Sequence, residues 1–139
     1  MIYMLDTNIC IYIIKRKPQS VINKFKQCSI NDVCISSITY AELEYVVSKS
    51  DFHHQNKIAL IQFLSPIAIL PFSDRAAVVY GDVRSRLEKA GTPIGPLDTL
   101  IAAHAISENL ILATNNTKEF ERVEDLQVEN WVSSLLSAS

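Results

Sequence analysis

Four short apolar runs recur along the chain, and each leads into a longer segment in which apolar residues return every three or four positions. A continuous apolar run of this length, bounded by polar residues, is typical of a strand buried on both faces of a sheet. The pattern predicts strands at residues 2–5, 33–35, 67–70 and 110–113, with a candidate fifth short strand at 128–132.

The segments between the runs have the periodicity of amphipathic helices. Helices are predicted at residues 9–14, 20–28, 37–48, 51–65, 73–90 and 97–107. In the third, fourth and fifth of these, the core-facing residues are expected to be Ile38, Ala41, Tyr45 and Val46, then Ile58, Ile61 and Leu64, then Ala76, Val79, Val83, Leu87 and Ala90. The sixth helix is apolar on nearly every side, so we expect it to be buried.

Strands that alternate with helices predict a three-layer α/β/α fold, in which helices cover both faces of a central, mostly parallel sheet of four to five strands. The chain has 139 residues, of which 48% are apolar and 20% charged, and this length suits one hydrophobic core. The only Pro- and Gly-rich stretch, residues 91–96, is too short to link two domains. We therefore expect a single domain over residues 1–139.

Several classes of protein are excluded by simple features of the sequence. No apolar run approaches the roughly 20 residues of a membrane-spanning helix, and Asp6 follows the start too soon for a signal peptide. The three cysteines form no CxxC pair and are expected to be packing residues. We expect a cytoplasmic protein without membrane contact. Its net charge of −2 means that binding to nucleic acid needs local positive charge.

Acidic residues stand where the carboxyl ends of the predicted strands place ligand sites in parallel sheets. Asp6 ends the first apolar run, where a carboxylate is costly to desolvate. The alternative is that Asp6 or Thr7 only caps the next helix. Glu42 shares a predicted helix face with apolar residues, but its alternative is a capping box with Thr39. Periodicity does not separate Glu42 cleanly from Glu44.

Asp98 lies in the most apolar helix of the chain, at a spacing that directs it inward with Ile101 and Ala102. If Pro96 is the first helical residue, the helix dipole alone could account for this carboxylate. After the fourth strand the polar candidates are Asn116 and Glu119. Their alternative is a short helix that is capped by Thr117 and has Glu119 in its first turn.

Several carboxylates at one sheet edge repel one another unless a cation lies between them. Oxygen ligands suit Mg²⁺ or Mn²⁺ better than zinc, which prefers His and Cys. The pattern therefore predicts metal-assisted phosphoryl chemistry. We expect Asp6 and Asp98 to bind Mg²⁺ directly, with Mn²⁺ able to substitute, and Glu42 and Glu119 to hold its waters or a second ion. Supporting roles are expected for Thr7, Asn8, Thr114 and Asn116, with Thr7 and Asn8 orienting Asp6 or a water.

Four segments together resemble PIN-domain ribonucleases of the VapC toxin type. They are Met4-Leu5-Asp6-Thr7-Asn8, residues 36–43 (Ser-Ser-Ile-Thr-Tyr-Ala-Glu-Leu), Ile94-Gly95-Pro96-Leu97-Asp98, and residues 113–123, which begin Ala-Thr-Asn-Asn-Thr-Lys-Glu. Asp6, Glu42 and Asp98 match the acids of that family. Asn116 stands where many relatives carry Asp, which leaves Glu119 to supply the nearby carboxylate.

The resemblance implies a toxin that cleaves RNA, is inhibited by a VapB-type antitoxin, and forms a homodimer that assembles with the antitoxin into a larger complex. Residues 91–98 look like the branch that cuts transfer RNA, commonly the initiator species in its anticodon stem-loop. The alternative is a catalytically inactive PIN fold that binds only RNA or protein. His53 and His54 are expected at the surface, and His104 in the core or at a dimer surface.

Overall fold

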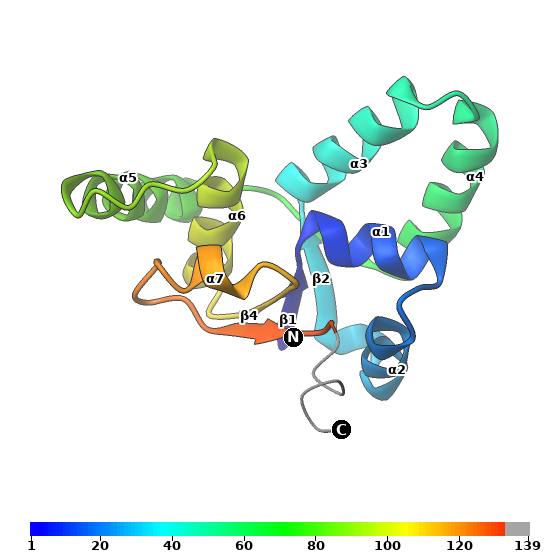
Figure 1. The fold of residues 1–139 in the computed structure, drawn as a ribbon, viewed down its shortest axis with the longest axis horizontal. Coiled ribbons are helices and arrows are strands. Elements are labelled where there is room, and N and C mark those ends of the chain that lie inside the picture. Colours follow the sequence, from blue (N-terminus) through cyan, green and yellow to red (C-terminus); the bar gives the residue numbers. More distant parts are fainter. Residues whose placement is uncertain (133–139) are drawn as a thin grey trace.

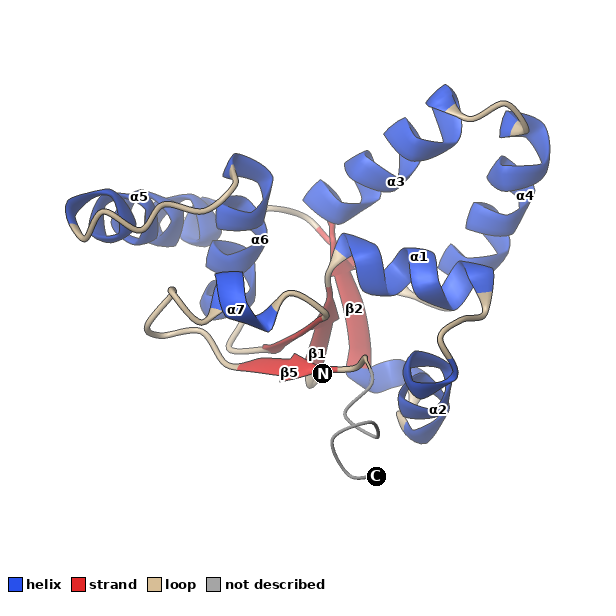
Figure 2. Ribbon diagram, viewed as in Figure 1, coloured by secondary structure: helices blue, strands red, loops and turns tan. Residues whose placement is uncertain are grey.

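The computed structural model describes residues 1–132, so the last seven residues of the predicted single domain lie outside the described part. A five-stranded sheet forms its centre, in the order β3-β2-β1-β4-β5, and every pair of neighbouring strands is parallel (Figure 2). The strands are β1 (Tyr3–Leu5), β2 (Val33–Ser36), β3 (Ala68–Leu70), β4 (Ile111–Thr114) and β5 (Val128–Asn130). The predicted strands, including the candidate fifth, are confirmed.

Helices cover both faces of this sheet (Figure 1). Helices α1 to α4 lie on one side and α5 to α7 on the other. Their bounds are α1 (Thr7–Lys15), α2 (Gln19–Gln27), α3 (Ser37–Lys49), α4 (His53–Leu64), α5 (Asp74–Lys89), α6 (Pro96–Ser107) and α7 (Thr117–Phe120), and a 3₁₀ turn at Ile30–Asp32 precedes β2. The three-layer α/β/α architecture is therefore confirmed.

Alternation along the strands builds a separate core on each face of the sheet. On β1, Met4 faces the core under α5 and α6, and Leu5 faces the core under α1 and α3. On β4, Leu112 and Ala113 divide in the same way. Side chains of a strand point alternately to opposite faces, and here both faces are dry, which is why these strands read as unbroken apolar runs.

The order of the strands places a crevice beside the end of β1. The chain passes from β1 to β2 and β3 on one side, and returns to β4 and β5 on the other. Leu5 pairs with Ala113, and the backbone N–H of Asp6 donates to the Ala113 carbonyl at 3.0 Å. In such sheets ligands bind where the strand order reverses, at the carboxyl ends of the strands.

Two of the predicted core-facing stripes are confirmed only in part, since Ile38 and Leu64 pack against the cores but other members do not. On α3 the buried residues are Thr39 and Leu43, whereas Tyr45 is 64% exposed. On α4 the buried residue is Leu60, whereas Ile58 and Ile61 are 46% and 56% exposed. Both helices carry apolar residues on more than one side, so periodicity alone does not identify the buried side.

The stripe predicted for α5 is largely confirmed. Ala76, Val83 and Leu87 are buried and Val79 is half-buried, while Ala90 ends the helix in solvent. The apolar helix α6 is buried as expected, from Ile101 to Ala105.

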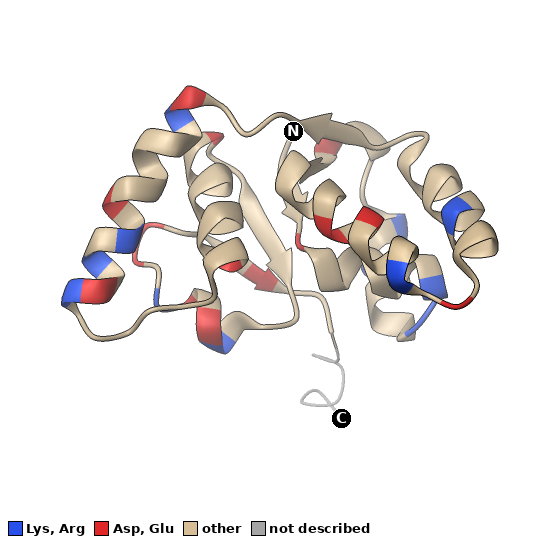
Figure 3. Ribbon diagram, turned by 90° about the horizontal axis from the view of Figure 1, so that it is seen from above, with Lys and Arg blue, Asp and Glu red and all other residues tan. Residues whose placement is uncertain are grey.

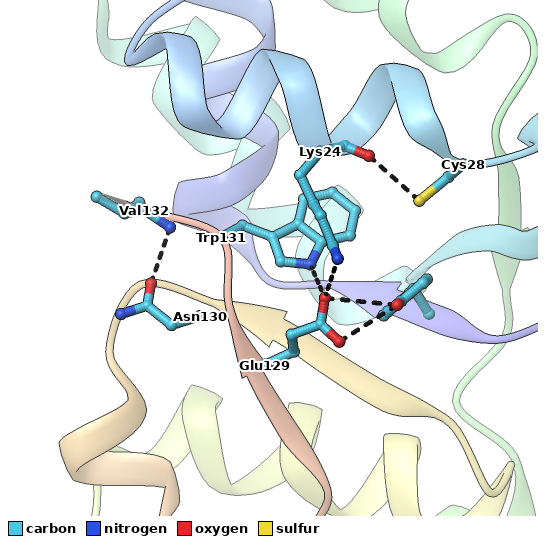
Figure 4. Close-up of polar contacts among 7 residues, drawn as sticks. Lys24, Cys28, Glu129, Asn130, Trp131 and Val132 are labelled. Atoms are coloured by element: carbon cyan, nitrogen blue, oxygen red, sulfur yellow. Dashed lines mark hydrogen bonds and ion pairs between the residues drawn. The ribbon is translucent and has the colours of Figure 1, made fainter. Parts of the chain in front are cut away.

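Glu129 of the edge strand β5 adds side-chain contacts to the pairing of this strand with β4 (Figure 4). Glu129 accepts hydrogen bonds from the Tyr3 hydroxyl at 3.2 Å and from the Trp131 indole at 3.0 Å. The Lys24 ammonium lies 2.9 Å from the same carboxylate and brings α2 against the sheet edge. One side chain thus joins β1, β5 and α2.

The three cysteines are packing residues, as expected. Cys10 and Cys34 are buried, Cys28 is half-buried, and all three are free thiols. None of the helices in residues 1–132 has the length and apolar character needed to cross a bilayer.

Candidate active site

Asp6 lies at the carboxyl end of β1 and is only 5% exposed. One carboxylate oxygen accepts a hydrogen bond from the Ile9 backbone at 2.9 Å, so Asp6 caps α1. The other oxygen accepts from the hydroxyl of Thr114, the last residue of β4. The capping role is therefore present, but it uses only one oxygen, and the second is oriented by the neighbouring strand.

Glu42 is turned toward Asp6 by α3 and held by α1. Its carboxylate accepts a hydrogen bond of 2.5 Å from the Thr7 hydroxyl. The capping box with Thr39 is wrong, because α3 is capped by Ser36, whose hydroxyl accepts from the Ile38 backbone at 3.0 Å. Thr39 is buried inside the first turn instead.

Glu44 is distinguished from Glu42 by the direction in which it points. Its carboxylate forms an ion pair of 2.6 Å with Lys57 of α4. It therefore joins α3 to α4 on a different side of the helix, and Glu42 is the acid that lines the cleft.

Asp98 reaches the same cleft from α6. The helix begins at Pro96, so Asp98 is in its first turn as expected, and it is half-buried. Gly95 precedes the helix, and a Cβ atom there would lie 3.7 Å from an Asp98 carboxylate oxygen. A side chain at position 95 would therefore compete with any ligand for the space beside this carboxylate.

Glu119 lies next to Asp98 and is held by two donors. The Asn116 side-chain amide donates to one of its oxygens at 2.9 Å, and the Gly95 backbone N–H approaches the other at 3.4 Å. Thr117 is not the cap of α7, because the N-cap residue is Asn116 and no side chain caps the helix. Asn116 therefore orients the Glu119 carboxylate, and Glu119 supplies the acid at this point of the site.

The segment after β4 organises much of the site through amide groups. The Asn116 backbone donates to the Thr114 hydroxyl at 2.9 Å, which places that hydroxyl against Asp6. The Asn8 amide donates to the side chain of Asn115 at 3.4 Å, and Asn115 in turn donates to the Tyr12 hydroxyl at 3.3 Å. The side chain of Thr7, expected to orient Asp6 or a water, contacts Glu42. The side chain of Asn8 contacts Asn115, while its backbone N–H acts on Asp6.

The carboxylates are close enough to resist ionisation together. Burial raises the pKa of Asp6 to about 6, against the hydrogen bonds from Thr114 and Ile9. Burial also raises the pKa of Asp98 to about 7, and the neighbouring Glu119 carboxylate adds to the rise. Since Glu119 is more exposed and accepts from Asn116, the proton shared by this pair resides on Asp98. Such a set of acids attracts cations strongly.

These carboxylates open into a cleft of about 310 Å³. Its lining residues are Asp6, Thr7, Asn8, Ile11, Glu42, Tyr45, Val46, Lys49 and Asp98. The strands beneath it carry neither Lys nor Arg, and in Figure 3 the basic residues lie on the helices and their connections. The three acids of the cleft lining, against the single lysine Lys49, give it an excess of negative charge.

The donors at this edge fit a hard divalent cation that keeps part of its water. All of them are oxygens, which Mg²⁺ and Mn²⁺ prefer. Within residues 1–132, no three His, Cys, Asp or Glu side chains converge closely enough to hold an ion by themselves. Mg²⁺ commonly binds through one or two carboxylates and several waters, so a site with two acids such as Asp6 and Asp98 would fit it.

Four further residues of the site escaped the sequence reasoning. Asn115 and Gly95 act through one amide and one backbone N–H, and no pattern in the sequence marks such contacts. Tyr45 and Lys49 had a signal, since they follow Glu42 by three and seven positions and so share its helix face. The apolar periodicity of the helix instead predicts Tyr45 as a core residue.

Comparison with known proteins agrees with this geometry. The PIN domain family matches over residues 3–126. Ribonuclease VapC2 of Rickettsia felis is 50% identical over 132 residues, which cover 94% of this chain and 98% of that protein. The chain belongs to the VapC family of PIN-domain ribonucleases. The expected family is therefore confirmed.

Two further comparisons add a substrate name and a complex. The tRNA(fMet)-specific endonuclease VapC of Shigella flexneri is 46% identical over 129 residues, covering 93% of this chain and 97% of that protein. The structure of VapBC2 from Rickettsia felis, bound to a DNA fragment from its promoter, includes a chain that matches with a TM-score of 0.88 and 48% identity. That match covers 94% of this chain and 99% of the other.

Proposed function

We propose that this VapC-family chain is the toxin of a VapBC pair and hydrolyses phosphodiester bonds in transfer RNA with the help of Mg²⁺. The observation that carries the proposal is the pairing of Asp6 and Asp98 in one cleft, where burial and mutual repulsion favour a bound cation. A site that only held RNA would gain nothing from two buried carboxylates, because they repel the phosphate backbone.

Each acid has a distinct place in this proposal. Asp6 and Asp98 hold the ion, and Thr114 keeps Asp6 in a fixed orientation through its hydrogen bond. When bound, Mg²⁺ lowers the pKa of water and offsets the negative charge that develops on the phosphate. Glu42 and Glu119, which are oriented by Thr7 and Asn116, hold water by accepting hydrogen bonds from it.

Water is the nucleophile that these residues serve best. Attack by the ribose hydroxyl commonly relies on a side-chain base such as His, but no histidine lines the cleft. His53 and His54 are exposed on α4, and His104 is buried against Ser36. The products should therefore carry 5′-phosphate and 3′-hydroxyl ends.

Transfer RNA, specifically the initiator species cut in its anticodon stem-loop, is proposed as the substrate because a relative that is 46% identical is named a tRNA(fMet)-specific endonuclease. The substrate would be met in the cytoplasm.

A VapB-type antitoxin is proposed as inhibitor because a close structural neighbour is part of a VapBC complex. An apolar groove of about 610 Å³, lined by Ile13, Ile22, Phe25 and Phe63 among others, supports a protein partner, and we propose a homodimer in the assembled complex.

The test is incubation of antitoxin-free protein with total tRNA and Mg²⁺ or Mn²⁺, beside samples that contain EDTA or the Asp6→Asn variant. Discrete fragments with 5′-phosphate ends, absent from both controls, are the expected result. Fragments with 2′,3′-cyclic phosphate would overturn the mechanism. If neither tRNA nor ribosomal RNA is cut with metal present, the chain is a binding module and the proposed activity is wrong.

A further inference from the structure

The acidic cleft has one wall that differs in chemistry from the rest. Glu42, Tyr45 and Lys49 occupy positions i, i+3 and i+7 of α3 and therefore lie on one face of this helix. All three line the cleft. Helix α3 projects from the sheet edge (Figure 1), so Tyr45 and Lys49 extend this wall outward from the acids by about 10 Å along the helix axis.

Tyr45 and Lys49 contact each other but have no other polar partner. The Tyr45 side chain is 64% exposed, and the Lys49 ammonium lies 4.9 Å from the centre of its ring. Within residues 1–132, neither side chain forms a hydrogen bond or an ion pair. An exposed aromatic ring with a cation above it is a prepared surface for a planar, anionic ligand.

Four of the ten Lys and Arg residues on the helices of residues 1–132 are paired with a carboxylate. Lys24, Lys57, Arg84 and Arg86 each lie within 4.0 Å of a carboxylate. Lys49 stands at the rim of the most acidic cleft and is not within that distance of any acid in the described chain. Its charge therefore remains available to a phosphate that approaches the cleft.

We propose that Tyr45 and Lys49 bind the nucleotide next to the scissile phosphate, the base stacked on the Tyr45 ring and its phosphate paired with the Lys49 ammonium. This inference rests on the proposed function and adds a substrate-binding role to it. Base stacking on an aromatic side chain is strong and tolerant of sequence, and lysine binds phosphate as a point charge. These two side chains, which we call the Tyr45–Lys49 platform, offset the repulsion between RNA and the acids.

A protein partner is the competing occupant of this surface. RNA fits better because the platform is continuous with the acid cleft in which the phosphate must lie, and because Lys49 complements a phosphate. Apolar partners fit better elsewhere, at the groove between α1, α2 and α4.

The experiment measures kcat and KM for tRNA cleavage by wild type, Tyr45→Ala, Tyr45→Phe and Lys49→Ala. Removing one stacked base raises KM roughly tenfold in Tyr45→Ala, with kcat within about twofold of wild type. Tyr45→Phe keeps the ring and should restore the wild-type KM. Lys49→Ala should weaken binding and reduce the salt dependence of kcat/KM by about one unit of log–log slope.

Two variants control for exposure and charge alone. Phe52→Ala removes a ring that is 68% exposed, and Lys89→Ala removes an exposed lysine at the end of α5. Neither residue lines the cleft, so both variants should match wild type. A second readout uses tRNA that carries 2-aminopurine beside the mapped cut, bound to Asp98→Asn protein. Its fluorescence should fall on binding, and the additional change Tyr45→Ala should abolish the fall.

The outcomes separate this inference from the proposed function. If wild type cleaves tRNA and Tyr45→Ala has an unchanged KM, the platform is refuted while the ribonuclease assignment stands. A loss in Tyr45→Phe as large as in Tyr45→Ala also refutes stacking. If Tyr45→Ala weakens binding of the antitoxin and leaves KM unchanged, the surface serves a protein. If wild type cleaves no RNA, both proposals fail.

Discussion

The Thr7 hydroxyl donates a hydrogen bond of 2.5 Å to the Glu42 carboxylate, although 35 positions separate the two residues in the chain. Thr7 begins α1 directly after Asp6, and Glu42 lies in the second turn of α3. The hydrogen bond therefore fixes the distance between two acids that come from different strand–helix units. It also occupies one oxygen of Glu42 and directs the other into the cleft.

Thr7→Val tests this contact because valine keeps the shape of threonine and removes the hydroxyl. We expect kcat for RNA cleavage to fall about tenfold, since Glu42 is no longer held in place, while the melting temperature changes little. Thr7→Ser, which restores a hydroxyl, should recover most of the activity. Thr92→Val, at an exposed position outside the cleft, is the matched control. Equal kcat in Thr7→Val and wild type would show that Glu42 needs no such support.

Asp98→Asn should abolish cleavage yet stabilise the metal-free protein. The folded state raises the pKa of Asp98 to about 7, so above that pH it must hold a charge that the unfolded chain holds freely. Replacing the partly solvated carboxylate by an amide should then add about 1 kcal/mol, or ~3 °C in melting temperature, at pH 8 in EDTA.

Metal should reverse this order. If Mg²⁺ binds only the folded protein, a concentration of about a hundred times Kd should raise the free energy of unfolding of wild type by about 2.7 kcal/mol. The same concentration should hardly affect Asp98→Asn. Asp51→Asn, on the exposed turn after α3, controls for loss of a negative charge. An equal response to Mg²⁺ in wild type and Asp98→Asn would remove Asp98 from the ligands.

The fold was predictable because its central strands, β1, β2 and β4, are buried on both faces. Residues such as Met4 and Leu5 contact different cores, so no polar residue interrupts the run. Asp6 and Asp98 stood out for the same reason, since each is a carboxylate in an apolar context. The order of the strands and the all-parallel pairing were not fixed by the pattern beyond the expectation of a mostly parallel sheet.

Contacts between distant residues were the part that the sequence could not supply. The pairing of Thr7 with Glu42 and of Asn116 with Glu119 depends on side-chain directions within the folded state. Exposed apolar residues were the second failure. Tyr45 and Ile61 have the spacing of core residues, yet both face outward, because periodicity does not distinguish a face that packs from a face that is open.

His104 should make stability depend on pH below neutrality. It is fully buried, its Nδ1 lies 2.8 Å from the Ser36 hydroxyl, and its Nε2 has no partner within residues 1–132. Burial lowers the pKa of this ring below 6.5. As the pH falls, His104 is therefore protonated in the unfolded state before it is protonated in the folded state. The stability of the folded protein that depends on the neutral ring is present above pH ~6.5 and is lost below it.

Urea unfolding at a series of pH values isolates this effect when wild type is compared with His104→Asn. Acidification from about pH 7 to 5 should lower the stability of wild type relative to the variant, although the variant is less stable throughout. In NMR spectra the His104 ring should titrate at a lower pH than an unperturbed histidine side chain, whose pKa is about 6.5. A His104 signal that titrates at or above that value contradicts the prediction.

Glu129 should contribute to stability without contributing to catalysis. Its carboxylate accepts from Tyr3 and Trp131 and pairs with Lys24, so three donors depend on one acceptor group (Figure 4). In Glu129→Gln the amide nitrogen is itself a donor and cannot accept hydrogen bonds from these groups. The negative charge that attracts Lys24 is also lost. We expect a loss of about 1.5–3 kcal/mol in the free energy of unfolding, which is the usual contribution of a hydrogen bond to a charged group. Lys24→Met removes only the partly exposed ion pair and should cost less than about 1 kcal/mol.

Cleavage measured well below the melting temperature should be unchanged in both variants, because Glu129 does not line the cleft. A Glu129→Gln protein as stable as wild type would show that the edge strand is held by packing of Trp131 against Tyr3, whose ring centres lie 5.3 Å apart, rather than by the carboxylate.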